Sequence, residues 1–292
     1  MADVKAAGTP FGTLTGKRAW TVPLIHVLLL GLSALFIFPL LWMLSTSLKP
    51  VDQIYAFPPV WVPKAMHWEN YPKAVSYIPF WTYTFNTVFI CVMGLIGAVL
   101  SNALVAYGFA RLQWPGRDVL FGFTLATMMI PFPVVMVPLY GVFRELGWIG
   151  TTLPMWVPSW FAGAFNIFLL RQFFLRIPAN LAEAARLDGA SELRVFWSVY
   201  LPLARPALAV VALFHFIWAW NDFLGPLLYL PHQQSFTLAI GLQFYQSQHG
   251  GTQWHLLMAA SMLTVLPVIL LFFFTQRTFL QGLTFLKNTE AN

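Results

Sequence analysis

The sequence is poor in charge and in cysteine. Only 9% of its 292 residues are Asp, Glu, Lys or Arg, whereas 59% are hydrophobic. Soluble globular domains carry roughly 25% charged residues, so this composition excludes an ordinary soluble domain. The single cysteine, Cys91, lies inside a long apolar run, which excludes disulfides within the chain and cysteine-based metal sites.

The motifs of several enzyme classes are also missing. The nearest match to a Walker A loop, from Gly12 to Arg18, has three residues between its glycines where four are needed. It also has Arg18 where Ser or Thr would hold magnesium. The six histidines show no metal-ligand spacing, and no motif for nucleophilic catalysis occurs. We therefore expect no catalytic residue, no metal site and no cofactor held by this chain.

Six apolar stretches have the length of a membrane span. They run from Thr21 to Leu44, Thr84 to Tyr107, Val119 to Val142, Leu153 to Leu170, Pro206 to Leu224 and Leu256 to Phe274. A helix needs roughly 20 residues to cross the hydrocarbon core of a bilayer. The predicted fold class is therefore an all-α polytopic membrane protein with six transmembrane helices, surrounded by the lipid bilayer.

The net charge of +6 is distributed unevenly between the loops. If the N-terminus is cytoplasmic, twelve Lys and Arg residues lie in inner segments and four in outer segments, namely Lys49, Lys64, Lys73 and Arg144. Positively charged loops stay in the cytoplasm, so both termini and the loop between the fourth and fifth spans are predicted to face inward. This topology explains the basic composition without a nucleic-acid partner. The first apolar run is too long for a signal peptide and indicates an anchor.

The inner loop between the fourth and fifth spans is unusually charged for this chain. Its first part has Glu183, Arg186 and Asp188 within six residues. Asn180 as an N-cap, with Glu183 three residues later, has the spacing of a capping box, and Gly189 can take the left-handed conformation that ends a helix. These signals predict a short helix from Leu181 to Asp188.

A second short helix is predicted directly after this one. Ser191 is a suitable N-cap for a helix from Glu192 to Tyr200, which would end near Leu201-Pro202. Small residues flanked by charges, such as Ala184 and Ala185, suit a knob that fits the groove of a partner. An ordinary amphipathic helix at the membrane surface has the same pattern, so local physics leaves both interpretations open.

The spacing of Glu183-Ala184-Ala185, Gly189 and Leu201-Pro202 resembles the cytoplasmic coupling loop of binding-protein-dependent ABC importer permeases. The resemblance extends from about residue 20 to residue 284 and includes "WAWNDFLGPLLYL" and the terminal "QRTFLQGLT". The chain is similar to the oligosaccharide and glycerol-phosphate branch, and there to the smaller, six-span permease of the maltose type. Its tail, Phe285 to Asn292, departs from that pattern.

The resemblance implies a domain organisation. It comprises a cytoplasmic N-terminal segment (1–20), a first span with an external loop that contains one short helix (21–83), a permease core of five spans (84–284) that includes the coupling loop (176–205), and a cytoplasmic tail (285–292).

The resemblance also implies function and partners. The chain would be one permease subunit of an importer in the inner membrane, which moves a sugar or a glycerol-phosphate-type solute by alternating access. Its partners would be a second homologous permease, two ATPase subunits that use ATP and Mg, and an extracytoplasmic solute-binding protein. The coupling residues implied are Glu183, Ala184, Ala185, Asp188, Gly189, Leu201 and Pro202. Glu183 would make a polar contact in the ATPase groove, the two alanines would allow close approach, and Gly189 would permit the turn.

Residues of the translocation pathway are harder to predict. The candidates are Asn86, Trp220, Asn221 and Asp222. Asp222 is the only acidic residue in or near a span, and at ~1.5 Å per residue it lies about 24 Å beyond Pro206, close to the outer boundary. A solvated helix end explains it nearly as well, and amides in spans more often bond neighbouring helices than solutes.

Two other classes remain open on the residues alone. An ion-coupled secondary transporter would need several intramembrane acids, whereas Asp222 stands alone. A membrane-embedded transferase would need a cluster of acids or histidines at one interface, and the sequence has none.

Overall fold

The computed structural model describes residues 16–246 and 251–289, and within these ranges every regular element is a helix. Four stretches are long and apolar enough to cross a membrane: Val22–Ser47, Phe80–Arg111, Leu153–Arg176 and Trp254–Gln276. Two bent pairs, 117–145 with a bend of 100° and 192–221 with a bend of 78°, bring the total to six if each pair is one span. The predicted fold class, an all-α polytopic membrane protein, is confirmed, and the count of six spans stays a prediction.

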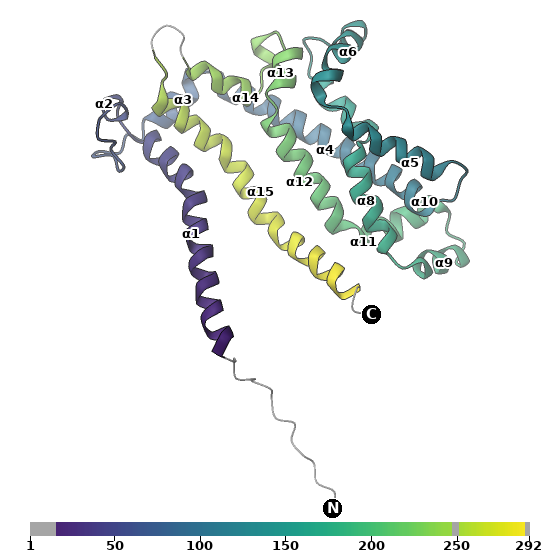
Figure 1. The fold of residues 1–292 in the computed structure, drawn as a ribbon. Helices are drawn as coiled ribbons and strands as arrows, with labels where there is room; N and C mark the ends of the chain where they lie inside the picture. The colour runs from purple at the N-terminus through teal and green to yellow at the C-terminus, as the bar shows by residue number, and fades with distance from the viewer. Residues whose placement is uncertain (1–15, 247–250, 290–292) are drawn as a thin grey trace, which may run out of the picture.

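The long helix α4 (Phe80–Arg111) is the element on which the others pack. It contacts α8 (Ala164–Arg176) along one side and α12 (Arg205–Asn221) along another. The last helix, α15 (Trp254–Thr289), contacts α12 and α1 (Gly16–Ser47). Figure 1 shows that α1 diverges from the other helices toward its N-terminal end, so most of its apolar surface is left exposed.

The two ends of the bundle carry different elements (Figure 1). The short helices α2 (Val51–Ile54), α3 (Asn70–Tyr77), α13 (Leu224–Tyr229) and α14 (Leu238–Gly241) lie at one end. The opposite end carries α9 (Ala179–Leu187), the start of α1 and the end of α15. This arrangement agrees with the predicted order of loops, in which the charged loop and both termini share one side.

Several predicted boundaries were wrong. The external loop holds two short helices, α2 and α3, instead of one, and α4 begins at Phe80 instead of Thr84. Residues 285–289 of the predicted tail continue α15, because no proline or glycine follows Gly282 to stop the helix. Residues 1–15 and 290–292 of the predicted terminal segments lie outside the described residues.

The third predicted span is bent by prolines. It consists of α5 (Arg117–Ala126), the 3₁₀ turn η1 (Thr127–Met129) and α6 (Phe132–Glu145). Pro131 precedes α6 and has no N–H to continue a helical ladder, and it holds the residue before it, Ile130, in an extended conformation. The bend of 100° lies at this point.

The fourth predicted span is also interrupted, which the sequence did not reveal. It consists of α7 (Leu153–Trp156), the 3₁₀ helix η2 (Val157–Phe161) and α8, separated from η2 by Ala162 and Gly163. Ala162 has a φ of +61°, a value that non-glycine residues seldom adopt. Irregular backbone at membrane depth must find partners in the protein. Here the Oγ of Ser101 accepts from the N–H of Ala162 (3.1 Å) and the Oδ1 of Asn102 from that of Gly163 (2.7 Å).

Asn102 is therefore expected to stabilise the break between η2 and α8. Its side chain is 1% exposed, and Asn102→Ala would leave the Gly163 N–H without its acceptor at this break. We expect the free energy of unfolding to fall by about 1–3 kcal/mol, measured by thermal unfolding of the purified protein in detergent. Asn221→Ala is the matched control, since that amide is exposed and, among the described residues, bonds the carbonyl of Ile217 in its own helix alone. Equal losses for the two variants would contradict this role.

Candidate functional site

The first helix of the charged loop, α9, begins earlier than predicted. It starts at Ala179, with Pro178 in the N-cap position and no side-chain cap. Pro178 keeps Ile177 before it extended and supplies a fixed φ at the helix start, so the proline determines this boundary. Asn180 lies inside the first turn, and the predicted capping box between Asn180 and Glu183 is wrong.

The end of α9 agrees with the sequence. Gly189 has a φ of +82°. The N–H of Ala190 donates to the carbonyl of Ala185 (3.0 Å) and that of Gly189 to the carbonyl of Arg186 (3.0 Å). These two bonds form a Schellman motif, whose left-handed position strongly favours glycine.

The second helix of the loop is longer than predicted. Ser191 caps it as expected, because its Oγ accepts from the N–H of Arg194 (3.4 Å). It runs through α10 (Glu192–Val195), the π-helical turn η3 (Phe196–Tyr200) and α11 (Leu201–Leu203), so it passes Leu201-Pro202 before it ends. The chain then turns by 78° into α12 at Ala204.

The two faces of α9 differ in exposure. Ala182 is buried, and Ala185 packs against the apolar cluster beneath the helix. Glu183, Ala184 and Asp188 are exposed, so only one of the two alanines expected at a partner surface lies on the outer face. Leu187 is 89% exposed, which makes it an apolar member of this face that the sequence interpretation did not single out.

A hydrogen-bonded network fixes the charged loop to α4. The Nε of Arg186 donates to the Oε1 of Glu192 (2.6 Å), and the hydroxyl of Tyr107 donates to the Oε2 of the same carboxylate (2.8 Å). The Arg186 guanidinium, and after it the Tyr107 hydroxyl, lower the pKa of Glu192, so the carboxylate is ionised at neutral pH. The Arg186–Glu192 pair is half-exposed, so it contributes little to stability. Its main effect is to hold the charged loop in a fixed position relative to α4.

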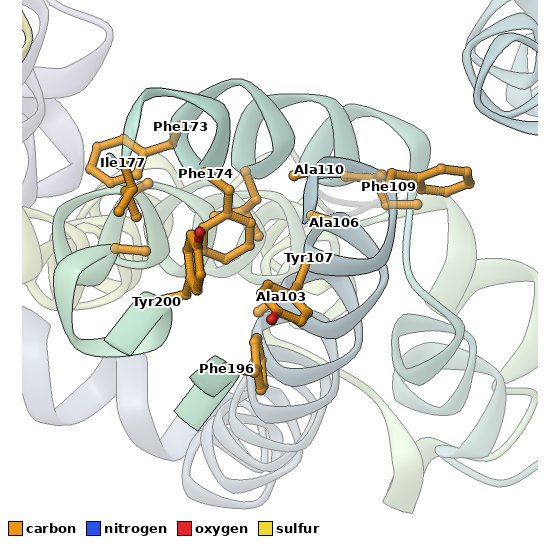
Figure 2. Close-up of a cluster of buried hydrophobic side chains, with 14 of the residues drawn as sticks. Ala103, Ala106, Tyr107, Phe109, Ala110, Phe173, Phe174, Ile177, Phe196 and Tyr200 are labelled. Atoms are coloured by element: carbon orange, nitrogen blue, oxygen red, sulfur yellow. The ribbon is translucent and has the colours of Figure 1, made fainter. Parts of the chain in front are cut away.

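An aromatic cluster lies beneath this network, between α4, α8 and η3 (Figure 2). The ring of Tyr107 is centred 5.2 Å from Phe196, 5.1 Å from Tyr200 and 6.4 Å from Phe174. Arg111, at the end of α4, donates to the carbonyls of Phe174 and Ile177 at the C-terminal end of α8, where the helix dipole favours a cation. The loop is therefore braced against the ends of α4 and α8.

Each of the four predicted pathway residues has a hydrogen-bond partner within the chain, and their place in a translocation pathway stays a prediction. Asn86 donates to the carbonyls of Gln234 (2.8 Å) and Phe236 (3.0 Å). The buried Trp220 donates to the carbonyl of Thr264 (3.1 Å).

The other two pathway candidates also have hydrogen-bond partners within the chain. Asn221 donates to Ile217 in its own helix (2.8 Å), and the Oδ1 of Asp222 accepts from the N–H of Gly225 (3.1 Å). None of the four lines the cavity of about 490 Å³ that lies among α4, η1, α8 and α12.

That cavity is lined by residues that the sequence interpretation had not joined. Asn102, Asn166, His215 and Trp218 border it together with Ser159. In the sequence, these polar residues have in common only that each lies inside an apolar run. The helical periodicity of each run does not show that residues from different runs face the same cavity.

These features define a class: an all-helical membrane protein with a charged loop braced at one end and a cavity between interrupted spans. The chain belongs to the family described as the inner membrane component of binding-protein-dependent transport systems, which matches residues 101–284.

Curated relatives agree with this assignment. The arabinooligosaccharide transport permease AraQ of Halalkalibacterium halodurans is 32% identical over 85% of this chain and 89% of its own length. The diacetylchitobiose uptake permease NgcG of Streptomyces coelicolor is 35% identical over 86% and 84%. The sn-glycerol-3-phosphate transport permease UgpE of Escherichia coli is 30% identical over 91% and 97%.

A solved structure has the same fold. It is a chain from the crystal structure of a bacterial ABC transporter involved in the import of the acidic polysaccharide alginate, with a TM-score of 0.79, 25% identity, and coverage of 92% of this chain and 99% of that chain. The predicted resemblance is therefore confirmed: the chain is a permease subunit of an ABC importer, works with an ATPase and a substrate-binding protein, and is not an enzyme. The secondary-transporter and transferase alternatives find no support.

Tyr107 offers a test of the brace. Tyr107→Phe keeps the ring and removes the hydrogen bond to Glu192, so stability should fall by only about 0.5–1.5 kcal/mol. We expect the reconstituted transporter to hydrolyse ATP but to move several-fold less solute per ATP. Tyr200→Phe is the control, since the Tyr200 hydroxyl has no hydrogen bond within the described residues. Unchanged coupling in Tyr107→Phe would remove this network from the transmission path.

Proposed function

We propose that this chain is one of two homologous permease subunits in an importer for a carbohydrate or a glycerol-phosphate-type solute. The named solutes of the relatives, arabinooligosaccharides, diacetylchitobiose and sn-glycerol 3-phosphate, support this class. Two ATPase subunits bind on the cytoplasmic side and use ATP and Mg, and the binding protein docks at the extracytoplasmic end. Both termini face the cytoplasm, which the excess of Lys and Arg in those segments supports.

The brace between the charged loop and the spans is the observation that carries this proposal. The outer face of α9, with Glu183, Ala184, Leu187 and Asp188, enters a cleft of the ATPase. Closure of the ATPase dimer displaces α9. Arg186 and Glu192 pass the displacement to Tyr107 in α4, and Leu201-Pro202 pass it through the bend into α12.

Alternating access follows from that displacement. Because Arg111 joins the end of α4 to the end of α8, these two helices move as one unit and expose the cavity to one side of the membrane at a time. The exposed apolar length of α1 supports a second membrane subunit or lipid as its surroundings.

The assembly is tested by purification of the tagged chain from its native membrane in mild detergent, with mass spectrometry of what copurifies. An ATPase at two copies per one different permease is the expected result. Recovery of the chain alone, active in transport, would overturn the proposal.

Gly189 tests the coupling loop itself. A Cβ at this position would meet nothing within 4 Å, so the cost of a substitution comes only from the φ of +82°. Gly189→Val should abolish ATP-driven uptake while the binding protein still binds its solute, because a β-branched residue is strained in this conformation. Gly189→Asn is the matched control, as Asn tolerates the left-handed region, and should keep much of the uptake. Normal uptake by Gly189→Val would contradict the proposed docking.

A further inference from the structure

The segment between α13 and α15 is hydrogen-bonded to α4. It contains η4 (Gln233–Ser235), α14 (Leu238–Gly241) and η5 (Leu242–Tyr245), and we call it the 233–245 segment. The amide of Asn86 in α4 donates to the carbonyls of Gln234 (2.8 Å) and Phe236 (3.0 Å). The Oγ1 of Thr87, which is 1% exposed, accepts from the N–H of Leu238 (2.9 Å). Two successive residues of α4 therefore hold three backbone groups of this segment.

Side-chain packing strengthens the same contact. A Cβ on Gly241 would lie 2.5 Å from the Cδ2 of Tyr83, so α14 lies directly on the Tyr83 ring without room for a methyl group. Tyr83 itself is fully buried, and the ring of Phe236 is centred 6.1 Å from it. Because close-packed groups transmit strain, the 233–245 segment and the first turns of α4 should move together.

The helix α4 is also suited to transmit a displacement along its length. Among the candidate spans that the structure describes, it alone has neither a proline nor a break. By contrast, α1 contains Pro23 and Pro39, α15 contains Pro267, and the other three spans are bent or interrupted. Helices kink chiefly at prolines and at breaks in their hydrogen-bond ladder. A displacement at one end of α4 therefore meets no hinge that would absorb it.

The two ends of α4 hold different parts of the chain. Figure 1 shows that α4 runs from α3 and α14 at one end of the bundle toward α10 near the other. At that other end Tyr107 bonds Glu192 of the charged loop. At ~1.5 Å per residue, about 32 Å of helix separates Asn86 from Tyr107. The 233–245 segment and the charged loop are therefore attached to one continuous helix.

We propose that Asn86 is a positioning residue for transport, which, with Thr87, fixes the 233–245 segment to α4. A displacement of the charged loop by the ATPase then moves this segment at the end of the bundle where the binding protein docks. Because coupling between two binding sites is reciprocal, docking of the binding protein also changes the affinity of the ATPase for nucleotide. The inference rests on the proposed function, which places the two partners at opposite ends of the chain.

A fluorophore on the 233–245 segment provides the test. The complete transporter carries Gln234→Cys in this chain, where the native side chain is exposed and Asn86 bonds the backbone carbonyl. The native Cys91 is buried, and a labelled complex without Gln234→Cys gives the background from thiols of other subunits. Emission of an attached environment-sensitive maleimide is recorded before and after addition of a non-hydrolysable ATP analogue with Mg. We expect the analogue to shift the emission.

Substitutions of Asn86 separate a positioning role from a merely structural one. Asn86→Leu is similar in size and removes both hydrogen bonds, so the emission shift should fall several-fold although the analogue still binds. Asn86→Asp has nearly the same shape but no N–H, and it should give the same loss. Asn86→Gln keeps an amide donor and should retain most of the shift. Thr84→Val is the control, since the Thr84 hydroxyl donates to the carbonyl of Phe80 within α4.

The outcomes distinguish this inference from the proposed function. An unchanged shift in both Asn86→Leu and Asn86→Asp would overturn the inference and place the route in α12 or α15 instead. An equal loss in Thr84→Val, or no shift in a complex that keeps Asn86 and binds the analogue, would also overturn it. In each case a transporter that still copurifies with its ATPase leaves the proposed function standing. Absence of the ATPase would overturn the function instead.

Discussion

The structure depends on one constraint: inside a bilayer, backbone N–H and C=O groups have no water to bond and must find partners in the protein. Uninterrupted helices such as α4 meet it within themselves. The fourth span is interrupted between η2 and α8 and cannot satisfy all of its own backbone groups. There Ser101 and Asn102 of α4 supply acceptors for the N–H groups of Ala162 and Gly163. At the other end of α8, Arg111 supplies donors for carbonyls that the helix leaves free.

These bonds give α4 a mechanical role as well as a stabilising one. Asn102 bonds the backbone at the start of α8 and Arg111 the backbone at its end, so α4 holds α8 at both ends. Between them, Tyr107 holds the charged loop through Glu192. At ~1.5 Å per residue, only about 8 Å of α4 separates Asn102, at the edge of the cavity, from Tyr107, where the loop is attached. A displacement of the loop therefore has a short, rigid route to the cavity.

The sequence predicts best what composition and local turn chemistry control. Spans follow from apolar length, and Gly189 and Ser191 hold the positions expected of them because each satisfies its own neighbours. Pro178 sets the start of α9, so the fixed φ of the proline outweighs the N-cap preference of Asn180. The break at Ala162 could not be predicted, because its cost is met by Ser101 and Asn102, which are about sixty residues away in the chain.

The candidate site also has a part that the sequence predicts, the charged loop, and a part that it does not, the cavity. The loop has a local pattern, so its residues could be named in advance, although the outward face of Leu187 and the inward packing of Ala185 depend on tertiary contacts. The cavity has no local pattern at all: Thr127, Asn166 and His215 come from three spans and meet only in the fold. Asn86 and Trp220 look like solute contacts in the sequence, yet their polar groups are taken up by neighbouring carbonyls. In an apolar chain of this kind, a conspicuous polar residue is therefore explained as readily by a carbonyl of a neighbouring helix as by a solute.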